Sequence, residues 1–473
     1  MKKISSYIWE YKIPYLIAIV SLLIAVTLDM MAPRLTARVV DDVIVGGNIG
    51  ELKYLLLGFL GIGLGRCVFQ YVKEYTFDKN GAKISGDMRR DLFRHIQGLS
   101  ADFFDKTNTG ELMARVKEDV DRIWDAMGYV SMLLLEVIYH TSIILVCMYM
   151  LNWKLALLPT AAMLLCGSFA VIMERMLGKV YEEISEENAA LNTVAEENLA
   201  GVRTVKAFAR EKFEITKFLS HNKRYYDLNM EQSKVFVRYY PCFTVVTKVL
   251  PLLTILVGGK FVIDGEITLG QMTAFVEYSA NIVWPMEMLG WLTNSFSAAV
   301  ASNKKIKKIY EVKPTITEVT DTVKLEKVEG KVCFDHESYH KEDMYEIHHD
   351  ISITVEPGKT LGIMGATGAG KTSIVQLLQR MYDATDGAIY LDDVNIRELS
   401  LEQLRTSVSY VMQDVFLFSD TINDNIKLGK KDYIDFKTVR RASTQAQASS
   451  FIERMEDTYD TVIGERGVGL SGG

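Results

Sequence analysis

Six long apolar stretches in the first 300 residues constrain the fold of this chain most strongly. Because the hydrocarbon core of a bilayer is crossed by about 20 apolar helical residues, each stretch is long enough to span a membrane. A buried helix of a soluble protein would explain one such stretch, but not six in succession. The sequence therefore predicts an all-α polytopic membrane domain with six transmembrane helices. Their approximate bounds are 13–32, 52–71, 127–151, 155–176, 239–263 and 269–292.

Lysine and arginine gather on one side of these stretches. They occur in the N-terminal MKK, in residues 73–122 and 203–238, and in the NKKIKK run at 303–308. The joints on the other side are short and contain acids with few bases. By the positive-inside rule we expect an integral, multi-pass protein, of a bacterial plasma membrane, with its N-terminus and its C-terminal region in the cytosol. The first stretch is too long for a cleavable signal peptide and lacks a small-residue cleavage site, so we expect it to remain as an anchor.

The cytosolic segments between the spans are long enough to continue the helices. Residues 52–100 contain no proline, and at about 1.5 Å per residue they would extend well beyond a bilayer core of about 30 Å. The Thr, Asn and Gly of DKTNTGE (105–111) favour a turn and a helix N-cap. A second break is predicted at 199–201. The pattern indicates helical hairpins that project from the membrane.

Charge and cysteine content exclude other classes. A net charge of −7, without a basic patch interleaved with aromatic residues, argues against a nucleic-acid-binding protein. The five cysteines lack metal-ligand spacing, and four lie in or beside apolar stretches, so we interpret them as packed thiols.

The second half of the chain contains a glycine-rich phosphate-binding pattern. The residues match G-x-x-x-x-G-K-[ST], after a predicted buried strand at 361–364 and before an amphipathic helix at 373–381. Glycines let successive N–H groups point at phosphate oxygens, at the positive end of a helix. A glycine-rich turn is the alternative, but the strand and the helix favour a site for ATP and Mg²⁺. The expected nucleotide ligands are Gly365, Ala366, Thr367, Gly368, Ala369, Gly370, Lys371, Thr372 and Ser373.

Within this loop, two side chains have distinct expected roles. The Lys371 ammonium would reach the β- and γ-phosphates and act as a catalytic residue, and the Thr372 hydroxyl would bind Mg²⁺. Kinases, GTPases and motor proteins share this loop, so it does not by itself fix the class of protein.

Four further motifs narrow the class. They are FFDKTNTGELMARVKEDV (103–120), ENLAGVRTVKAFARE (197–211), YVMQDVFLFSDTINDNI (410–426) and TVIGERGVGLSGG (461–473). With the phosphate loop and six spans, and in this order, the chain resembles an ATP-binding cassette (ABC) exporter half-transporter. The resemblance implies a transmembrane domain at 1–310, a linker at 311–330, and the N-terminal part of an α/β P-loop nucleotide-binding domain at 331–473.

The resemblance also implies roles for single residues. Gln413 matches the glutamine that contacts Mg²⁺ and the attacking water in the family, and Glu465 and Arg466 match a loop that contacts the intracellular loops. Ser471, Gly472 and Gly473 match the start of the LSGGQ signature, which grips the γ-phosphate on the partner subunit's phosphate loop. A half-transporter must therefore act as a homodimer or heterodimer, with the lipid bilayer and an exported substrate as its further partners.

One departure concerns the aromatic residue that stacks on adenine in the family. In VCFDHESYHKEDMY the expected position falls on Lys341, and Tyr339, or else Tyr345, would have to substitute. The alternative interpretation of Tyr339 is a core residue of a strand. Weak adenine stacking would suit a subunit with one impaired site in a heterodimer.

The resemblance implies ATP-driven export by alternating access of a lipid, drug or peptide. Ionisable residues in the spans are the candidates for substrate contact, because charge in a membrane is costly and usually functional. The alternative is that several pair with one another, such as Lys248 with a glutamate. A non-pumping ATP-binding regulator or a degenerate partner subunit is the rival function. The candidate residues for substrate contact in the spans are Asp29, Glu136, His140, Lys248, Glu277 and Glu287.

The family's remaining catalytic groups follow the signature motif. These are the Walker B strand with its glutamate and the switch histidine, and all seven histidines of this chain precede Ser471. We therefore expect a chain truncated at LSGG, which binds nucleotide weakly and does not hydrolyse it at a useful rate. Robust ATPase activity of the 473-residue chain would contradict this expectation.

Overall fold

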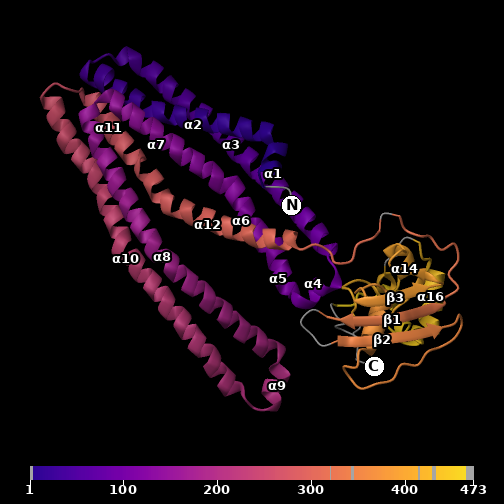
Figure 1. Ribbon diagram of the computed structural model, residues 1–473. Helices are drawn as coiled ribbons and strands as arrows, with labels where there is room; N and C mark the ends of the chain where they lie inside the picture. The colour runs from indigo at the N-terminus through magenta and orange to yellow at the C-terminus, as the bar shows by residue number, and fades with distance from the viewer. Residues whose placement is uncertain (1–3, 320, 342–345, 414–415, 429–432, 465–473) are drawn as a thin grey trace. The chain divides into compact units, whose positions relative to one another are not determined.

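The computed structural model describes residues 4–319, 321–341, 346–413, 416–428 and 433–464. The chain divides into two compact units, Met1–Thr315 and Ile316–Gly473, and each is described by itself. The first unit is helical and the second contains the sheet (Figure 1).

Long helices dominate the first unit. Short helical segments connect them: α1 (Ile4–Glu10), η1 (Val39–Val45), α4 (Ala101–Lys106), α5 (Thr109–Ala114), η2 (Arg115–Asp119), α6 (Val120–Asp125), η3 (Ala126–Val130) and α9 (Val202–Ala207). The long helices are α2 (Lys12–Arg38), α3 (Ile49–Gln97), α7 (Ser131–Leu151), α8 (Trp153–Ala200), α10 (Glu211–Ile263) and α12 (Val283–Glu311), with the shorter α11 (Leu269–Asn281) before α12.

Five helical segments in the described part of the chain are long and apolar enough to cross a membrane. They confirm the first five predicted spans and are Lys12–Val45, Ile49–Gln97, Thr109–Leu151, Trp153–Ala200 and Glu211–Ile263.

The sixth predicted span, 269–292, is not one uninterrupted helix. It is divided between α11 and α12, with Ile282 at the junction. Pro285 lies in the first turn of α12, where its missing N–H is tolerated. The same proline has no N–H to donate to the carbonyl of Asn281, so the first helix cannot continue through it unchanged. The predicted stretch is therefore helical but present as two helices, and the break at Ile282 was not predicted.

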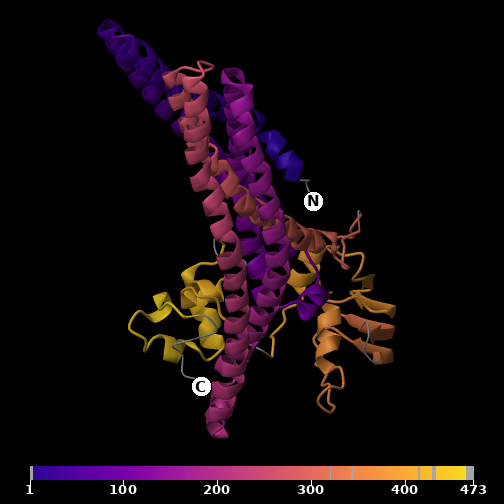
Figure 2. The same cartoon turned by 90° about the vertical axis from the view of Figure 1, so that its left-hand side faces the viewer.

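The predicted helical extensions are confirmed. α3, α8 and α10 contain 49, 48 and 53 residues, more than a bilayer core requires. α8 and α10 run side by side and are joined by α9 (Figures 1 and 2). The predicted breaks are also present: the Asn108 side chain accepts a hydrogen bond from Gly110 N before α5, and α8 ends before Gly201.

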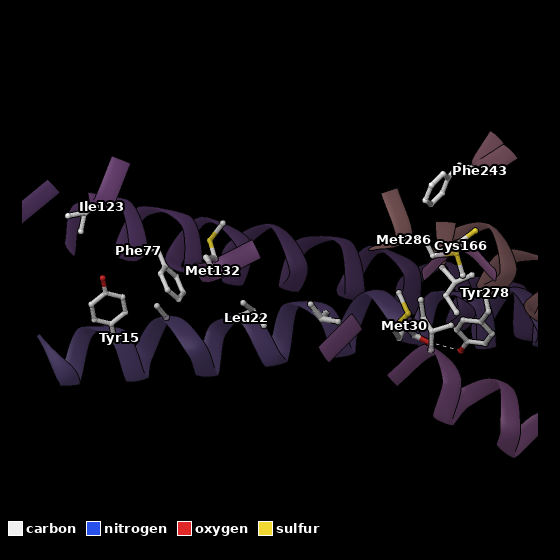
Figure 3. Close-up of a cluster of buried hydrophobic side chains, with 14 of the residues drawn as sticks. Tyr15, Leu22, Met30, Phe77, Ile123, Met132, Cys166, Phe243, Tyr278 and Met286 are labelled. Atoms are coloured by element: carbon white, nitrogen blue, oxygen red, sulfur yellow. Dashed lines mark hydrogen bonds between the residues drawn. The ribbon is translucent and has the colours of Figure 1, made fainter. Parts of the chain in front are cut away.

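Interdigitated aromatic and methionine side chains hold the bundle together (Figure 3). The Tyr15 and Phe77 rings meet edge to face, with centroids 5.4 Å apart. Tyr278 is fully buried, and its hydroxyl donates to the Met30 carbonyl oxygen over 2.8 Å. Buried tyrosine hydroxyls need such a partner, so this bond fixes α11 against α2.

A carboxylate ties the N-terminus of α11 to η1. Asp41 accepts from the Thr268 hydroxyl at 2.6 Å and from Gly270 N at 2.8 Å. Thr268 and Gln271 also form a reciprocal capping box. A Cβ on Gly270 would lie 2.2 Å from the Ala37 carbonyl oxygen, so this close approach requires glycine.

The second unit is built on a four-stranded antiparallel sheet in the order β2-β1-β3-β4. Its strands are β1 (Val332–His340), β2 (Glu346–Val355), β3 (Asp386–Leu391) and β4 (Val394–Asn395). Phe334, Ile389 and Leu391 of the sheet pack with Leu377 of α13 (Lys371–Leu378) and with Leu404 of α14 (Leu401–Ser407). A second apolar cluster joins α15 (Ile422–Ile426), α16 (Phe436–Gln445), α17 (Ser449–Ile452) and η4 (Thr458–Asp460).

The strand predicted at 361–364 is absent from the described structure. The segment belongs to no sheet there, and Met364 is 90% exposed. A buried parallel strand is stable only when it pairs with neighbours and is covered on both faces. In the described residues this segment has neither, so its apolar composition alone does not make it a strand.

The Asp41 contacts predict a measurable effect on stability. Asp41→Ala should lower the free energy of unfolding by about 1–2 kcal/mol, because it removes an acceptor at a helix N-terminus. Thermal unfolding of the detergent-solubilised chain would measure the change. Asp42→Ala is the matched control, since the adjacent Asp42 is exposed. Equal melting temperatures for the two variants would contradict the role of Asp41.

Candidate functional site

The phosphate loop occupies residues 365–370 and leads directly into α13. Gly368 and Gly370 have φ of +86° and +81°, a conformation that side chains disfavour. Gly365 to Ala369 are exposed, so the loop backbone is accessible to a ligand. Gly370 is the N-cap of α13 and accepts from Ser373 N at 3.0 Å. The arrangement places successive backbone N–H groups and the positive end of a helix at one place.

Lys371 folds back over this loop. Its Nζ donates to the carbonyl oxygens of Gly365, at 2.8 Å, and of Ala366, at 2.6 Å. The same ammonium can exchange these neutral acceptors for phosphate oxygens, which form stronger charge-assisted hydrogen bonds. Thr372 is exposed beside it and carries a hard oxygen of the kind that Mg²⁺ prefers. These groups fit a nucleoside triphosphate and its metal.

A buried acid and imidazole lie behind the loop, and sequence analysis did not identify them. Glu337 of β1 and His348 of β2 are 0% and 3% exposed. His348 Nδ1 lies 3.2 Å from both carboxylate oxygens of Glu337, and His348 Nε2 lies 2.9 Å from the Gly370 carbonyl oxygen. Burial raises the pKa of Glu337, and the hydrogen bond with His348 opposes this. The signal in the sequence that could have identified Glu337 was the period-two spacing of a strand, which puts Glu337 on the same side of β1 as Tyr339.

The structure places Tyr339 in the core of the sheet. Its ring is 6% exposed and lies 5.9 Å from the Tyr382 ring and 6.2 Å from the His348 ring, between centroids. Lys341, at the position expected for the aromatic residue, has its Nζ 5.4 Å from the Tyr382 ring centroid. These are the contacts of a core strand residue. Stacking of Tyr339 on adenine stays a prediction.

The remaining predicted site residues are exposed or lie outside the described residues. Gln413 lies in an exposed bend, and its roles toward Mg²⁺ and water stay predictions. Tyr345, Glu465, Arg466, Ser471, Gly472 and Gly473 lie outside the described residues.

The helical unit contains a polar cavity of about 320 Å³. Three of the six candidate ionisable residues line it: Asp29 of α2, with Glu136 and His140 of α7. Asp29 pairs with Arg66 of α3, and Glu136 pairs with Lys73, whose Nζ lies 2.8 Å from Oε2. Asp29 and Glu136 thus pair with Arg66 and Lys73, and not with other candidate residues. The lining residues are Ala25, Val26, Asp29, Arg66, Gln70, Glu136, His140, Ala280, Asn281 and Trp284.

Two ionisable side chains are buried here, His140 in the lining and Lys73 as the partner of Glu136. Lys73, behind the wall, is 1% exposed, so Glu136 is its compensating charge. His140 is 8% exposed, its Nδ1 has no hydrogen-bond partner in the described structure, and its ring meets Trp284 edge to face at 6.0 Å. Of the remaining candidates, Lys248 is exposed and Glu277 is half-buried, while the side chain of Glu287 lies outside the description.

A larger apolar cavity of about 500 Å³ lies among α8, α10 and α12. Among the described side chains that line it, Glu174 is the one acid or base. Trp284 lines the polar cavity and Met286 the apolar one, so the N-terminal part of α12 contributes to both. The apolar cavity is lined by Ala170, Met173, Glu174, Leu177, Gly178, Tyr181, Phe236, Tyr240, Phe243, Met286, Trp291 and Ser297.

The chain combines a unit of membrane-length helices with a unit that carries a phosphate loop. This combination defines an ATP-linked membrane protein. Residues 15–286 match the ABC transporter transmembrane region, and residues 348–473 match the ABC transporter family. The chain belongs to the ABC transporter family, as a half-transporter of the exporter type. The family match implies that the second unit binds ATP.

Curated relatives match along nearly the whole chain. The ABC transporter ATP-binding protein YknU of Bacillus subtilis is 30% identical over 474 residues, which are 100% of this chain and 81% of the relative. The ATP-dependent lipid A-core flippase of Desulfotalea psychrophila is 29% identical, with 100% and 82% covered. The multidrug resistance-like ATP-binding protein MdlA of Escherichia coli is 28% identical, with 97% and 78% covered.

The buried Lys73–Glu136 pair predicts an asymmetric mutational response. Glu136→Ala leaves a buried ammonium without its partner and should destabilise the chain by about 3–5 kcal/mol. The double variant Lys73→Met/Glu136→Leu removes both charges and should stay close to the parent. Thermal unfolding in one detergent would compare them. A Glu136→Ala variant as stable as the parent would contradict this account.

Proposed function

We propose that this chain is one subunit of a dimeric exporter that uses ATP to move an amphipathic compound across a bacterial membrane. The apolar cavity carries the proposal, because its described lining offers aromatic and methionine side chains beside the acid Glu174. Such linings suit hydrophobic molecules with a polar end, and the volume is within the usual range of about 300–1,000 Å³ for ligand pockets. The names of the relatives support lipid-like or drug-like substrates over peptides.

The polar cavity supplies a second part of the proposed substrate path. Asp29 and Glu136 each already have a cation, so the cavity is close to neutral. A polar headgroup that forms hydrogen bonds can enter without leaving a charge uncompensated. Trp284 and Met286 both lie in the first turns of α12, directly after its junction with α11, so a movement there would alter both cavities together.

The phosphate loop would supply the energy step. Lys371 and the N–H groups of residues 365–372 would hold the phosphates, and Thr372 and Gln413 would bind Mg²⁺. We further propose that Ser471, Gly472 and Gly473 act on the nucleotide of the partner subunit. The lysines and arginines of residues 73–122 and 203–238 support a cytosolic position for both chain ends.

A second function is favoured by Lys341 in place of an aromatic residue. An ATP-binding subunit with weak adenine contacts would act as a regulator or as the impaired half of a heterodimer. Vanadate-sensitive ATPase activity of the full-length protein in liposomes distinguishes the two. A pump requires it, whereas a regulator binds ATP without turnover.

Nucleotide binding has a direct test at Lys371. Lys371→Ala should weaken binding of Mg²⁺-ATP at least about tenfold, because it removes charge-assisted hydrogen bonds to phosphate. Equilibrium binding of a fluorescent ATP analogue, competed with ATP, would measure this. Lys359→Ala, an exposed lysine before the loop, is the control. Similar affinity in both variants would refute the assigned phosphate site.

The substrate site has its own test in the apolar cavity. Trp291→Ala should lower the affinity for a fluorescent short-chain phospholipid or a hydrophobic dye by about tenfold, through loss of ~1.4 kcal/mol of apolar contact. Fluorescence titration of the chain in nanodiscs measures the affinity. Trp153→Ala is the control, because Trp153 is exposed at the start of α8 and outside the cavity lining. An effect of the control equal to that of Trp291→Ala would place binding elsewhere.

A further inference from the structure

The three contacts of His348 connect the sheet to the phosphate loop. Gly370 contributes a carbonyl oxygen, which can only accept, so the hydrogen between it and His348 Nε2 resides on the nitrogen. Nδ1 then faces the Glu337 carboxyl group, at 3.2 Å from each oxygen. A proton on either Nδ1 or the carboxyl group completes a hydrogen bond between them. The pair is therefore neutral overall whichever group holds that proton, which makes its complete burial tolerable.

The orientation of one peptide group makes this contact relevant to phosphate binding. The described structure contains no cis peptide bond, so the Gly370 carbonyl and the Lys371 N–H point in opposite directions. A carbonyl held against His348 directs the Lys371 N–H out of the helix N-terminus, where an anion binds. The same carbonyl accepts from Ser373 N at 3.0 Å, so it anchors both the helix and the loop.

The packing around Gly370 shows that the contact is close. A Cβ on Gly370 would lie 2.8 Å from His348 Nε2 and 2.8 Å from the Ile347 Cγ2. Glycine is therefore required at position 370 by the lack of space for a side chain as well as by its φ of +81°. The loop therefore cannot move at Gly370 without breaking the contacts that join His348 to Gly370 and to Glu337.

We propose that Glu337 and His348 are positioning residues for ATP, which fix the Gly370–Lys371 peptide in its phosphate-binding orientation. The proposal rests on the proposed function of the loop as the ATP site. His348 supplies the donor to the loop, and Glu337 fixes the orientation and the protonated nitrogen of the imidazole.

The decisive variant is Glu337→Val/His348→Leu in the full chain. It removes both polar partners together, so neither is left buried alone, and the fold should be retained. We expect the affinity for Mg²⁺-ATP to fall about tenfold, as for loss of one preorganising hydrogen bond to the loop. Glu337→Gln keeps a hydrogen-bonding group against Nδ1 and should restore affinity to within about twofold. If Glu337 and His348 had only a structural role, variants with equal melting temperatures would not differ in their affinity for ATP.

His349→Leu is the matched control. His349 is the next residue on β2, is exposed, and pairs with Glu346 at the surface. It should bind ATP as the parent does. If the double variant melts at a lower temperature than the parent, Glu337→Leu tests the proposal instead. This variant keeps the Nε2 donor of His348 and loses only the group that orients the ring. Its affinity for Mg²⁺-ATP should therefore fall about threefold.

The outcomes separate this proposal from the function on which it rests. Parental affinity in the double variant, or in Glu337→Leu if the double variant is unstable, overturns the positioning role. Failure of the parent to bind ATP, or of Lys371→Ala to weaken binding, overturns the assigned ATP site itself. If Glu337→Gln binds Mg²⁺-ATP as weakly as the double variant does, the proposal is also contradicted.

Discussion

The absence of water from the bilayer core is the constraint on which most of this structure depends. Backbone N–H and C=O groups there have to be satisfied within the chain, so the apolar segments form long helices. The interruption between α11 and α12 conforms to the same rule. Its neighbours Asn281 and Trp284 line a polar cavity, and irregular backbone at membrane depth is tolerated where it lines a cavity.

Burial of charge is resolved in a similar way in both units. Lys73 meets Glu136 in the helical unit, and His348 meets Glu337 in the sheet unit. Each pair removes the large cost of an isolated buried charge, although an apolar pair of similar size would fold as well. Pairs of this kind are weak evidence for stability. Their positions, beside a cavity and behind a phosphate loop, are the reason to assign them functional roles.

Much of the architecture was predictable from the sequence because it follows from local patterns. Apolar length gave five of the six spans, and the proline-free run 52–100 gave the extension of α3 beyond the membrane. Turn residues near Asn108 and Gly201 located the breaks. Apolar content did not indicate the break at Ile282 within the sixth stretch. The strand predicted at 361–364 is absent because a strand depends on neighbours that local composition does not supply.

The candidate sites were predictable to a different degree. Spacing alone identified the phosphate loop, because glycines with positive φ, a lysine and a hydroxyl have to follow one another directly. It did not reveal Glu337 and His348, since their relation to Gly370 arises from pairing of strands that are far from the loop in sequence. It named Asp29, Glu136 and His140 as polar residues in spans, but not that they line one cavity.

The sequence by itself determined the helical membrane domain, the phosphate loop and the family. Those features depend on chemistry repeated within a few residues, such as apolar runs and the G-x-x-x-x-G-K-[ST] spacing. The tertiary structure alone decided which charges pair, where the two cavities form, and which side chain holds the Gly370 carbonyl. The physical reason is that pairing and cavity formation act over a few ångströms in space, between residues that the chain separates by tens of positions.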